Sequence, residues 1–212
     1  MAKVKICGIS RIEDIGYVNQ CLPEYVGFVF AESRRKVSLD MARTLRSGLN
    51  SRIKTVGVFV NEQPEAILEI VRGCRLGIVQ LHGDESPEYI EDLKASLRLS
   101  FKYPVEVWKA IRVRNMDAIK SISNYNADAY LLDTYVENSY GGAGKIFDWN
   151  LAAEAGKKNK IILAGGLDIK NVREAVRVVQ PYAVDVSSGI ETEGFKDGNK
   201  VRNFVCVARS YE

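Results

Sequence analysis

A reactive side chain stands near the start of the chain, in a setting typical of enzymes. The segment Val4–Cys7 is a short apolar run that ends on the thiol of Cys7, and Gly8 follows it directly. In closed parallel α/β barrels the carboxyl ends of the strands carry the chemistry, whereas the opposite ends serve stability. The thiol therefore suggests a parallel α/β enzyme, although core packing is an alternative role for Cys7.

Other polar side chains follow later apolar runs in the same way. Gln80 and His82 share one face of the fourth run, because side chains alternate along a strand. For a lone histidine a core role is an equal alternative, and paired arginines are commonly solvated. If the runs are parallel strands, all these side chains meet at one end of the fold. The candidate lining of that pocket is Cys7, Arg34, Arg35, Gln80, His82, Asp133 and Asp185.

Three loops late in the chain combine glycine with small or polar residues. Two of them follow the seventh and eighth apolar runs, where barrels commonly hold phosphate with backbone N–H groups. Glycine lets the backbone approach an anion, and serine hydroxyls add donors. A tight turn is the ordinary alternative for each loop alone. Together the loops predict a small phosphorylated substrate, held by Gly142, Gly144, Gly165, Gly166, Ser187, Ser188 and Gly189.

The elements that would position these residues alternate along the whole chain. The predicted strands are Val4–Cys7, Tyr25–Phe30, Thr55–Val60, Gly77–Leu81, Val107–Ile111, Ala129–Asp133, Lys160–Leu163 and Ala183–Val186. The predicted helices are Ile12–Gln20, Leu39–Ser47, Pro64–Arg72, Pro87–Leu97, Met116–Ser121, Trp149–Ala155, Val172–Val179 and Lys200–Arg209. Ser86 and Asn61 are candidate caps of the helices that start near them.

Strict alternation of eight strands with eight helices predicts a closed (β/α)8 TIM barrel that spans residues 1–212 as a single domain. Alternation requires parallel pairing and right-handed crossovers. The chain lies near the lower end of the range of about 200 to 400 residues for this fold, which leaves little room for an inserted domain. A doubly wound open sheet is the competitor, but it usually has fewer strands and a glycine-rich first turn. Gly8 alone does not supply that turn.

Composition excludes several classes of function. The net charge is only +3, and the densest basic cluster is Arg34-Arg35-Lys36. That pattern argues against a nucleic-acid groove or a polybasic membrane patch, but it suits a small anionic ligand. The four cysteines are scattered and there is one histidine, so the clustered ligands of a zinc site are missing. Cys21, Cys74 and Cys206 are expected to be reduced core or boundary residues. Without an apolar signal segment or membrane-length run, we expect a cytoplasmic enzyme.

At this level of detail the chain resembles the phosphoribosylanthranilate isomerase family of tryptophan biosynthesis. The segments that carry the resemblance occur in the family's order over nearly the whole length, and the pair formed by the first and the last is highly specific. These segments are KICGI at 5–9, GFVF at 27–30, VGVFV at 56–60, QLHG at 80–83, LLD at 131–133, GGAGKIFDW at 141–149, LAGGL at 163–167 and DVSSG at 185–189.

The resemblance implies an isomerase that converts N-(5-phosphoribosyl)anthranilate into 1-(2-carboxyphenylamino)-1-deoxyribulose 5-phosphate by an Amadori rearrangement. It implies no cofactor and no metal. Cys7 is then the general base and Asp133 the general acid. Arg35 reaches the substrate, Gln80, His82 and Asp185 line the pocket, and the glycine loops hold the phosphate.

Both members of the implied acid–base pair need tuning by their surroundings. A free thiol has a pKa near ~8.5, so Cys7 must be partly ionised by its environment or paired closely with substrate. A free aspartic acid is almost fully ionised at neutral pH, so Asp133 must be kept protonated, with Leu131 as an apolar neighbour.

Three positions depart from the family's pattern: Ser10, Lys36 and Ala143. Lys36 replaces an aromatic residue after the arginine, so Arg34 is an alternative to Arg35. Among rival functions, the histidine-pathway aminoaldose isomerase has an aspartate on its first strand and two phosphate sites. Indole-glycerol-phosphate synthase would need a lysine acid and an N-terminal extension. A non-catalytic phosphate-binding barrel is the rival from another class, and both monomer and homodimer are open.

Overall fold

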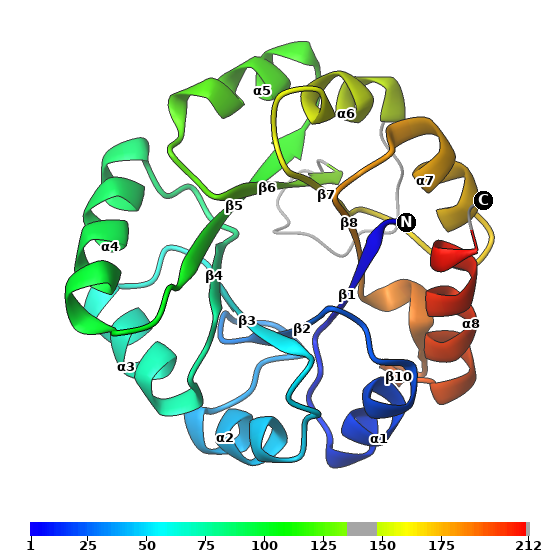
Figure 1. The fold of residues 1–212 in the computed structure, drawn as a ribbon, viewed down its shortest axis with the longest axis horizontal. Helices are drawn as coiled ribbons and strands as arrows, with labels where there is room; N and C mark the ends of the chain where they lie inside the picture. The colour runs from blue at the N-terminus through cyan, green and yellow to red at the C-terminus, as the bar shows by residue number, and fades with distance from the viewer. Residues whose placement is uncertain (135–147, 211–212) are drawn as a thin grey trace.

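The computed structural model describes residues 1–134 and 148–210. Eight parallel strands close into a barrel in chain order, and the helices surround it (Figure 1). The strands are β1 (Lys3–Cys7), β2 (Tyr25–Val29), β3 (Lys54–Phe59), β4 (Ile78–Leu81), β5 (Glu106–Val113), β6 (Ala129–Thr134), β7 (Ile161–Leu163) and β8 (Ala183–Val186). The barrel closes where β1 pairs with β8, with Lys5 opposite Asp185. The predicted (β/α)8 architecture is confirmed.

One helix follows each strand. The helices are α1 (Ile12–Cys21), α2 (Leu39–Ser47), α3 (Pro64–Cys74), α4 (Pro87–Ser100), α5 (Met116–Lys120), α6 (Trp149–Gly156), α7 (Val172–Val179) and α8 (Gly198–Arg209). Two short 3-10 turns, η1 (Ser121–Asn124) and η2 (Ser188–Ile190), extend the fifth and eighth units. Most predicted boundaries fall within two residues of those observed; α4 runs three residues further. The assignment of residues 1–212 to a single domain stays a prediction.

A hairpin between β8 and α8 was not predicted. It consists of β9 (Glu191–Thr192) and β10 (Phe195–Lys196), which pair antiparallel. Glu193 and Gly194 form its two-residue turn, and both have positive φ, as a tight hairpin of matching twist requires. Strands of two residues are too short to show alternation, so the sequence pattern could not indicate them.

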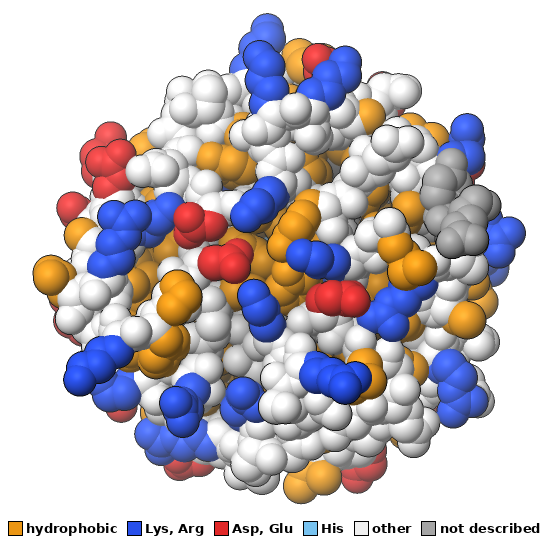
Figure 2. Space-filling view, viewed as in Figure 1, with side chains coloured by type: hydrophobic (Ala, Val, Ile, Leu, Met, Phe, Trp, Pro, Cys, Tyr) orange, Lys and Arg blue, Asp and Glu red, His pale blue; other side chains and the backbone are white. Residues whose placement is uncertain are grey.

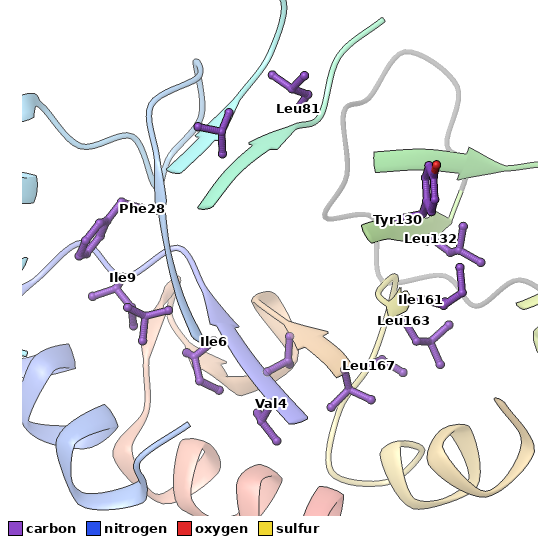
Figure 3. Close-up of a cluster of buried hydrophobic side chains, with 14 of the residues drawn as sticks. Val4, Ile6, Ile9, Phe28, Leu81, Tyr130, Leu132, Ile161, Leu163 and Leu167 are labelled. Carbon is purple, nitrogen blue, oxygen red and sulfur yellow. The ribbon is translucent and has the colours of Figure 1, made fainter. Parts of the chain in front are cut away.

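Two separate apolar clusters follow from the alternation of side chains along the strands. The outer cluster fills the space between strands and helices; Figure 3 shows Val4, Ile6 and Leu163 on the helix side of their strands. The inner cluster lies inside the barrel, where the rings of Tyr25 and Trp108 meet edge to face at 5.1 Å. These bulky rings fill part of the barrel interior.

Two expectations about single residues need correction. Ser86 caps α4 as predicted, since its side chain accepts a hydrogen bond from Tyr89 N. Asn61, in contrast, is not a cap: α3 begins after Gln63, and the Asn61 side chain accepts from Asp84 N instead, across a loop contact. Cys206 is exposed rather than a core or boundary residue, because it lies on the outer face of α8.

Candidate active site

A cavity of about 480 Å³ opens at the carboxyl ends of the strands. Apolar side chains of β2 and β3, among them Val29 and Val58, form one part of its wall. Of the predicted site residues, those that line the cavity are Cys7, Arg35, Gln80, His82, Asp133, Asp185 and Ser187. The structure therefore brings together residues that are up to 180 positions apart in the chain.

Strand register explains why these particular residues meet. Cys7 lies two positions after Lys5 on β1, and Asp133 lies two positions after Leu131, an inner-cluster residue, on β6. Every second side chain of a barrel strand points inward, so each of these residues forms the last inward position of its strand. The interior is apolar at its base and polar at its mouth, and chemistry is possible only at the mouth.

Cys7 lies in a crowded, buried position. It is 9 % exposed, and it pairs with Gly27 of β2. A Cβ atom on Gly27 would lie 2.9 Å from the Cys7 sulfur, so a side chain at position 27 would displace the thiol. Burial raises the pKa of the Cys7 thiol above its usual value, against the opposing effect of the nearby Lys5 ammonium. Ionisation of Cys7 by its surroundings or by close pairing with substrate therefore stays a prediction, and Lys5 is the nearest group that favours it.

Asp133 faces the only histidine of the chain. Its Oδ2 lies 3.3 Å from His82 Nε2, and both side chains are nearly buried. Gln80 Nε2 is 2.9 Å from His82 Nδ1, so the Gln80 amide orients the imidazole ring. Asp133 thus has a polar neighbour in addition to the apolar Leu131 below it.

The side-chain oxygen of Gln80 is buried without a hydrogen-bond partner among the described residues. The Gln80 side chain is 1 % exposed, and its Oε1 accepts no hydrogen bond from any of the described residues. Buried polar atoms are almost always hydrogen-bonded in finished complexes. Gln80 itself lines the cavity.

Arg35 crosses the mouth of the cavity and is held by a carboxylate. Its Nε and Nη2 donate to Glu191 at 2.7 and 2.9 Å, and Lys196 donates to the same carboxylate at 2.7 Å. Its side chain lies over Gly8, where a Cβ would come within 2.4 Å of Arg35 Cδ. Arg34 also touches Glu191, but its side chain is 67 % exposed and does not line the cavity.

The glycine loops after β7 and β8 form a cradle of backbone donors. Gly165 and Gly166 have positive φ, and a Cβ on Gly189 would lie 2.0 Å from the Leu167 carbonyl oxygen, so these turns require glycine. The N–H groups of Gly165, Gly166, Ser188 and Gly189 find no acceptor within the two described ranges. Gly142 and Gly144, which we also predicted to bind phosphate, lie outside the described residues.

The Ser187 hydroxyl has a structural contact of its own. It donates to the carbonyl oxygen of Cys7 at 3.1 Å and lies 3.3 Å from Lys196 Nζ. This contact ties the end of β8 to the end of β1.

A buried ion pair braces the loop that carries His82. Lys109 Nζ donates to Glu85 at 2.6 Å and to the carbonyl oxygen of Gly83 at 2.7 Å, and both charged side chains are almost fully buried. Glu85 also accepts from the backbone N–H groups of Gly83 and Asn61. Lys109 and Glu85 therefore hold the β4–α4 loop, which carries His82, in place.

Three site residues escaped the sequence reasoning: Lys5, Glu191 and Lys196. Lys5 had a readable signal, because a lysine two positions before Cys7 on the same strand must point into the barrel. Glu191 and Lys196 had none, because they lie on the hairpin that the pattern could not reveal.

Charged side chains also cover the surface outside the cavity. Basic and acidic side chains both appear on the face shown in Figure 2, and basic side chains predominate toward its lower left. In residues 1–134 and 148–210 there is no group of three or more His, Cys, Asp or Glu arranged to hold a metal ion. None of the helices in those ranges has the length and apolar character needed to cross a bilayer.

Comparison with known proteins gives one consistent result. The family model for N-(5'-phosphoribosyl)anthranilate (PRA) isomerase matches residues 4–207. The N-(5'-phosphoribosyl)anthranilate isomerase of Acetivibrio thermocellus is 56 % identical over 210 residues, which cover 99 % of this chain and 96 % of that one.

Solved structures agree in fold and length. A form of the dimeric phosphoribosylanthranilate isomerase of Thermotoga maritima superimposes with a TM-score of 0.85 at 38 % identity, covering all of both chains. A phosphoribosyl anthranilate isomerase in complex with reduced 1-(o-carboxyphenylamino)-1-deoxyribulose 5-phosphate gives a TM-score of 0.85 at 36 % identity, again over all of both chains.

Proposed function

The chain belongs to the N-(5'-phosphoribosyl)anthranilate isomerase family, and we propose that Cys7 is the general base and Asp133 the general acid of its reaction. The enzyme converts N-(5-phosphoribosyl)anthranilate into 1-(2-carboxyphenylamino)-1-deoxyribulose 5-phosphate by an Amadori rearrangement in tryptophan biosynthesis. The observation that supports the assignment is that a thiol and a carboxyl group line one cavity from strands separated by β7 and β8.

The acid acts first. Asp133 protonates the oxygen of the furanose ring, so that the ring opens and the nitrogen lone pair forms a Schiff base. The thiolate of Cys7 then takes the proton from C2, and the electrons of that C–H bond form the double bond of an enolamine. Tautomerisation of the enolamine gives the ketone. Each proton transfer by a positioned group typically contributes ~10²–10⁴-fold to the rate.

The two ends of the substrate have separate places in this proposal. The ribose phosphate binds to the backbone N–H groups of the loops after β7 and β8, with η2 beside them. The sugar lies between Cys7 and Asp133, within reach of Gln80, His82 and Asp185. The aromatic ring occupies the apolar wall of β2 and β3, where Val29 and Val58 lie.

We also propose a cellular compartment and an oligomeric state for the enzyme. The four cysteines are free thiols, which supports a reducing, cytoplasmic compartment. The chain works as a monomer or a homodimer, and the Thermotoga maritima relative is dimeric.

A direct assay tests the reaction. The purified chain, supplied with N-(5-phosphoribosyl)anthranilate and a metal chelator, is expected to consume the substrate at the same rate as without the chelator, because the proposed steps need only protein side chains. Loss of substrate is measured by its fluorescence. Absence of turnover above background would favour a barrel that binds phosphate without catalysis.

Arg35→Ala is expected to lower kcat/KM by roughly 10- to 100-fold, because one hydrogen bond between charged groups contributes about 1.5–3 kcal/mol. Glu191 occupies Nε and Nη2, so Nη1 is the atom available to the anthranilate carboxylate. Arg34→Ala is the matched control, since that arginine touches the same glutamate but lies in solvent. Steady-state kinetics of the two variants test the assignment. A larger loss of kcat/KM in the Arg34 variant would show that Arg34, and not Arg35, contacts the substrate.

A further inference from the structure

Lys5 is a buried cation beside the proposed base, and no step above uses it. Its side chain is 0 % exposed, and its Nζ donates to Asp185 Oδ1 at 2.9 Å. A Cβ placed on Gly27 would lie 3.3 Å from Lys5 Nζ and 2.9 Å from Cys7 Sγ. The ammonium and the sulfur therefore converge over the same glycine, inside the barrel.

Stability alone is a poor reason for this arrangement. Removing two charges from water costs as much as their attraction returns in many proteins, and a well-packed apolar pair is often at least as stable. The neighbouring inward positions of the inner cluster, such as Val56 and Ile78, are indeed apolar. The Lys5–Asp185 pair is better explained by the electrostatic field that it creates at the Cys7 sulfur.

The charges that face Cys7 come from every element around it. Lys5 lies on β1, Asp185 on β8, Lys196 on β10 and Arg35 on the loop after β2, and Glu191 on β9 binds the last two cations. Three cations and two carboxylates leave an excess of one positive charge when Cys7 is a thiol. A thiolate balances this cluster.

Burial and Asp185 raise the pKa of the Cys7 thiol, whereas Lys5 and Lys196 lower it. If Lys5 were absent, desolvation of the sulfur and the Asp185 carboxylate would both still raise the pKa of Cys7, and the nearest cation that lowers this pKa would be missing.

We propose that Lys5 is a positioning residue that holds the thiolate form of Cys7 by donating a hydrogen bond to its sulfur, while Asp185 keeps Lys5 in place. The inference deepens the proposed function and rests on Cys7 being the base. In the proton step, the thiolate accepts hydrogen from C2 and becomes a thiol, and the C–H electron pair enters the enolamine double bond. Lys5 keeps its three protons throughout, and the thiol returns its proton to solvent water after turnover.

The test follows the ionisation of Cys7 without using activity. The folded protein is treated with iodoacetamide between about pH 6 and 10, the range in which thiols ionise, and alkylation of the Cys7 peptide is measured by mass spectrometry. Lys5→Met is expected to move the midpoint to higher pH, and each whole pH step of that movement lowers the alkylation rate at neutral pH about tenfold. Asp185→Asn is expected to lower the midpoint, because Cys7 then becomes the counter-ion of Lys5. If the Lys5–Asp185 pair had only a structural role, the two variants would not move the Cys7 midpoint in opposite directions.

Lys109→Met is the matched control, since it removes another buried lysine that is paired with a carboxylate, at 2.6 Å, away from Cys7. It is expected to lower stability and leave the Cys7 midpoint at the wild-type value. A Lys5→Met midpoint no higher than that of the control overturns the proposal. If Lys5→Met does not fold, Asp185→Asn decides, and an unchanged or raised midpoint overturns it. Full turnover by a Cys7→Ala variant would instead refute the base assignment, which this alkylation series does not measure.

Discussion

Cys7→Ala is expected to reduce kcat by about 10²–10⁴-fold, because the thiolate that accepts the C2 proton is then missing. Substrate binding should persist, since the phosphate loops, Arg35 and the apolar wall are untouched. Alanine removes only the sulfur and keeps the Cβ atom of residue 7. The change therefore separates chemistry from binding more cleanly than substitution of any charged residue in the site.

Two measurements check this expectation. Steady-state kinetics give kcat, and calorimetry with reduced 1-(o-carboxyphenylamino)-1-deoxyribulose 5-phosphate gives the affinity for a stable product analogue. Cys74→Ala is the control, because Cys74 is a buried thiol on α3, outside the cavity, and its loss should leave kcat at the wild-type value. A Cys7→Ala enzyme with more than a tenth of the wild-type kcat would contradict the role of Cys7.

Residues on regular strands were the ones that the sequence could locate. Cys7, Gln80, Asp133 and Asp185 all follow apolar runs with period-two alternation, and such runs must be parallel strands when helices separate them. The closed barrel then follows from the number of strands, and the carboxyl ends meet without any knowledge of side-chain contacts. This part of the site is a consequence of backbone geometry, so pattern alone was sufficient.

Residues held by long-range contacts were beyond the same reasoning. The partner of Arg35 is Glu191, 156 positions later on a two-residue strand, and nothing in the local sequence links them. The ionisation of Cys7 is a similar case, because it depends on the balance between burial and charges from separate elements. Alternation predicts where a side chain points, but not the sum of the fields that act on it.

The second large effect concerns the acid. Asp133→Asn is expected to reduce kcat by about 10²–10⁴-fold while the product analogue still binds, since an amide has the shape of the carboxyl group but no proton to transfer. Asp128→Asn is the matched control: this carboxylate lies just before β6 and binds Lys94 and Val107 N outside the cavity, so kcat should stay at the wild-type value with some loss of stability.

The position of His82 makes this experiment decisive for the assignment of the acid. Its Nε2 lies 3.3 Å from Asp133 Oδ2, so the imidazole is the other proton carrier beside the proposed acid. If Asp133 is the acid, the asparagine variant loses turnover although the imidazole is still present. If the variant keeps more than a tenth of the wild-type kcat, the imidazole must supply the proton, and Asp133 then serves to orient His82.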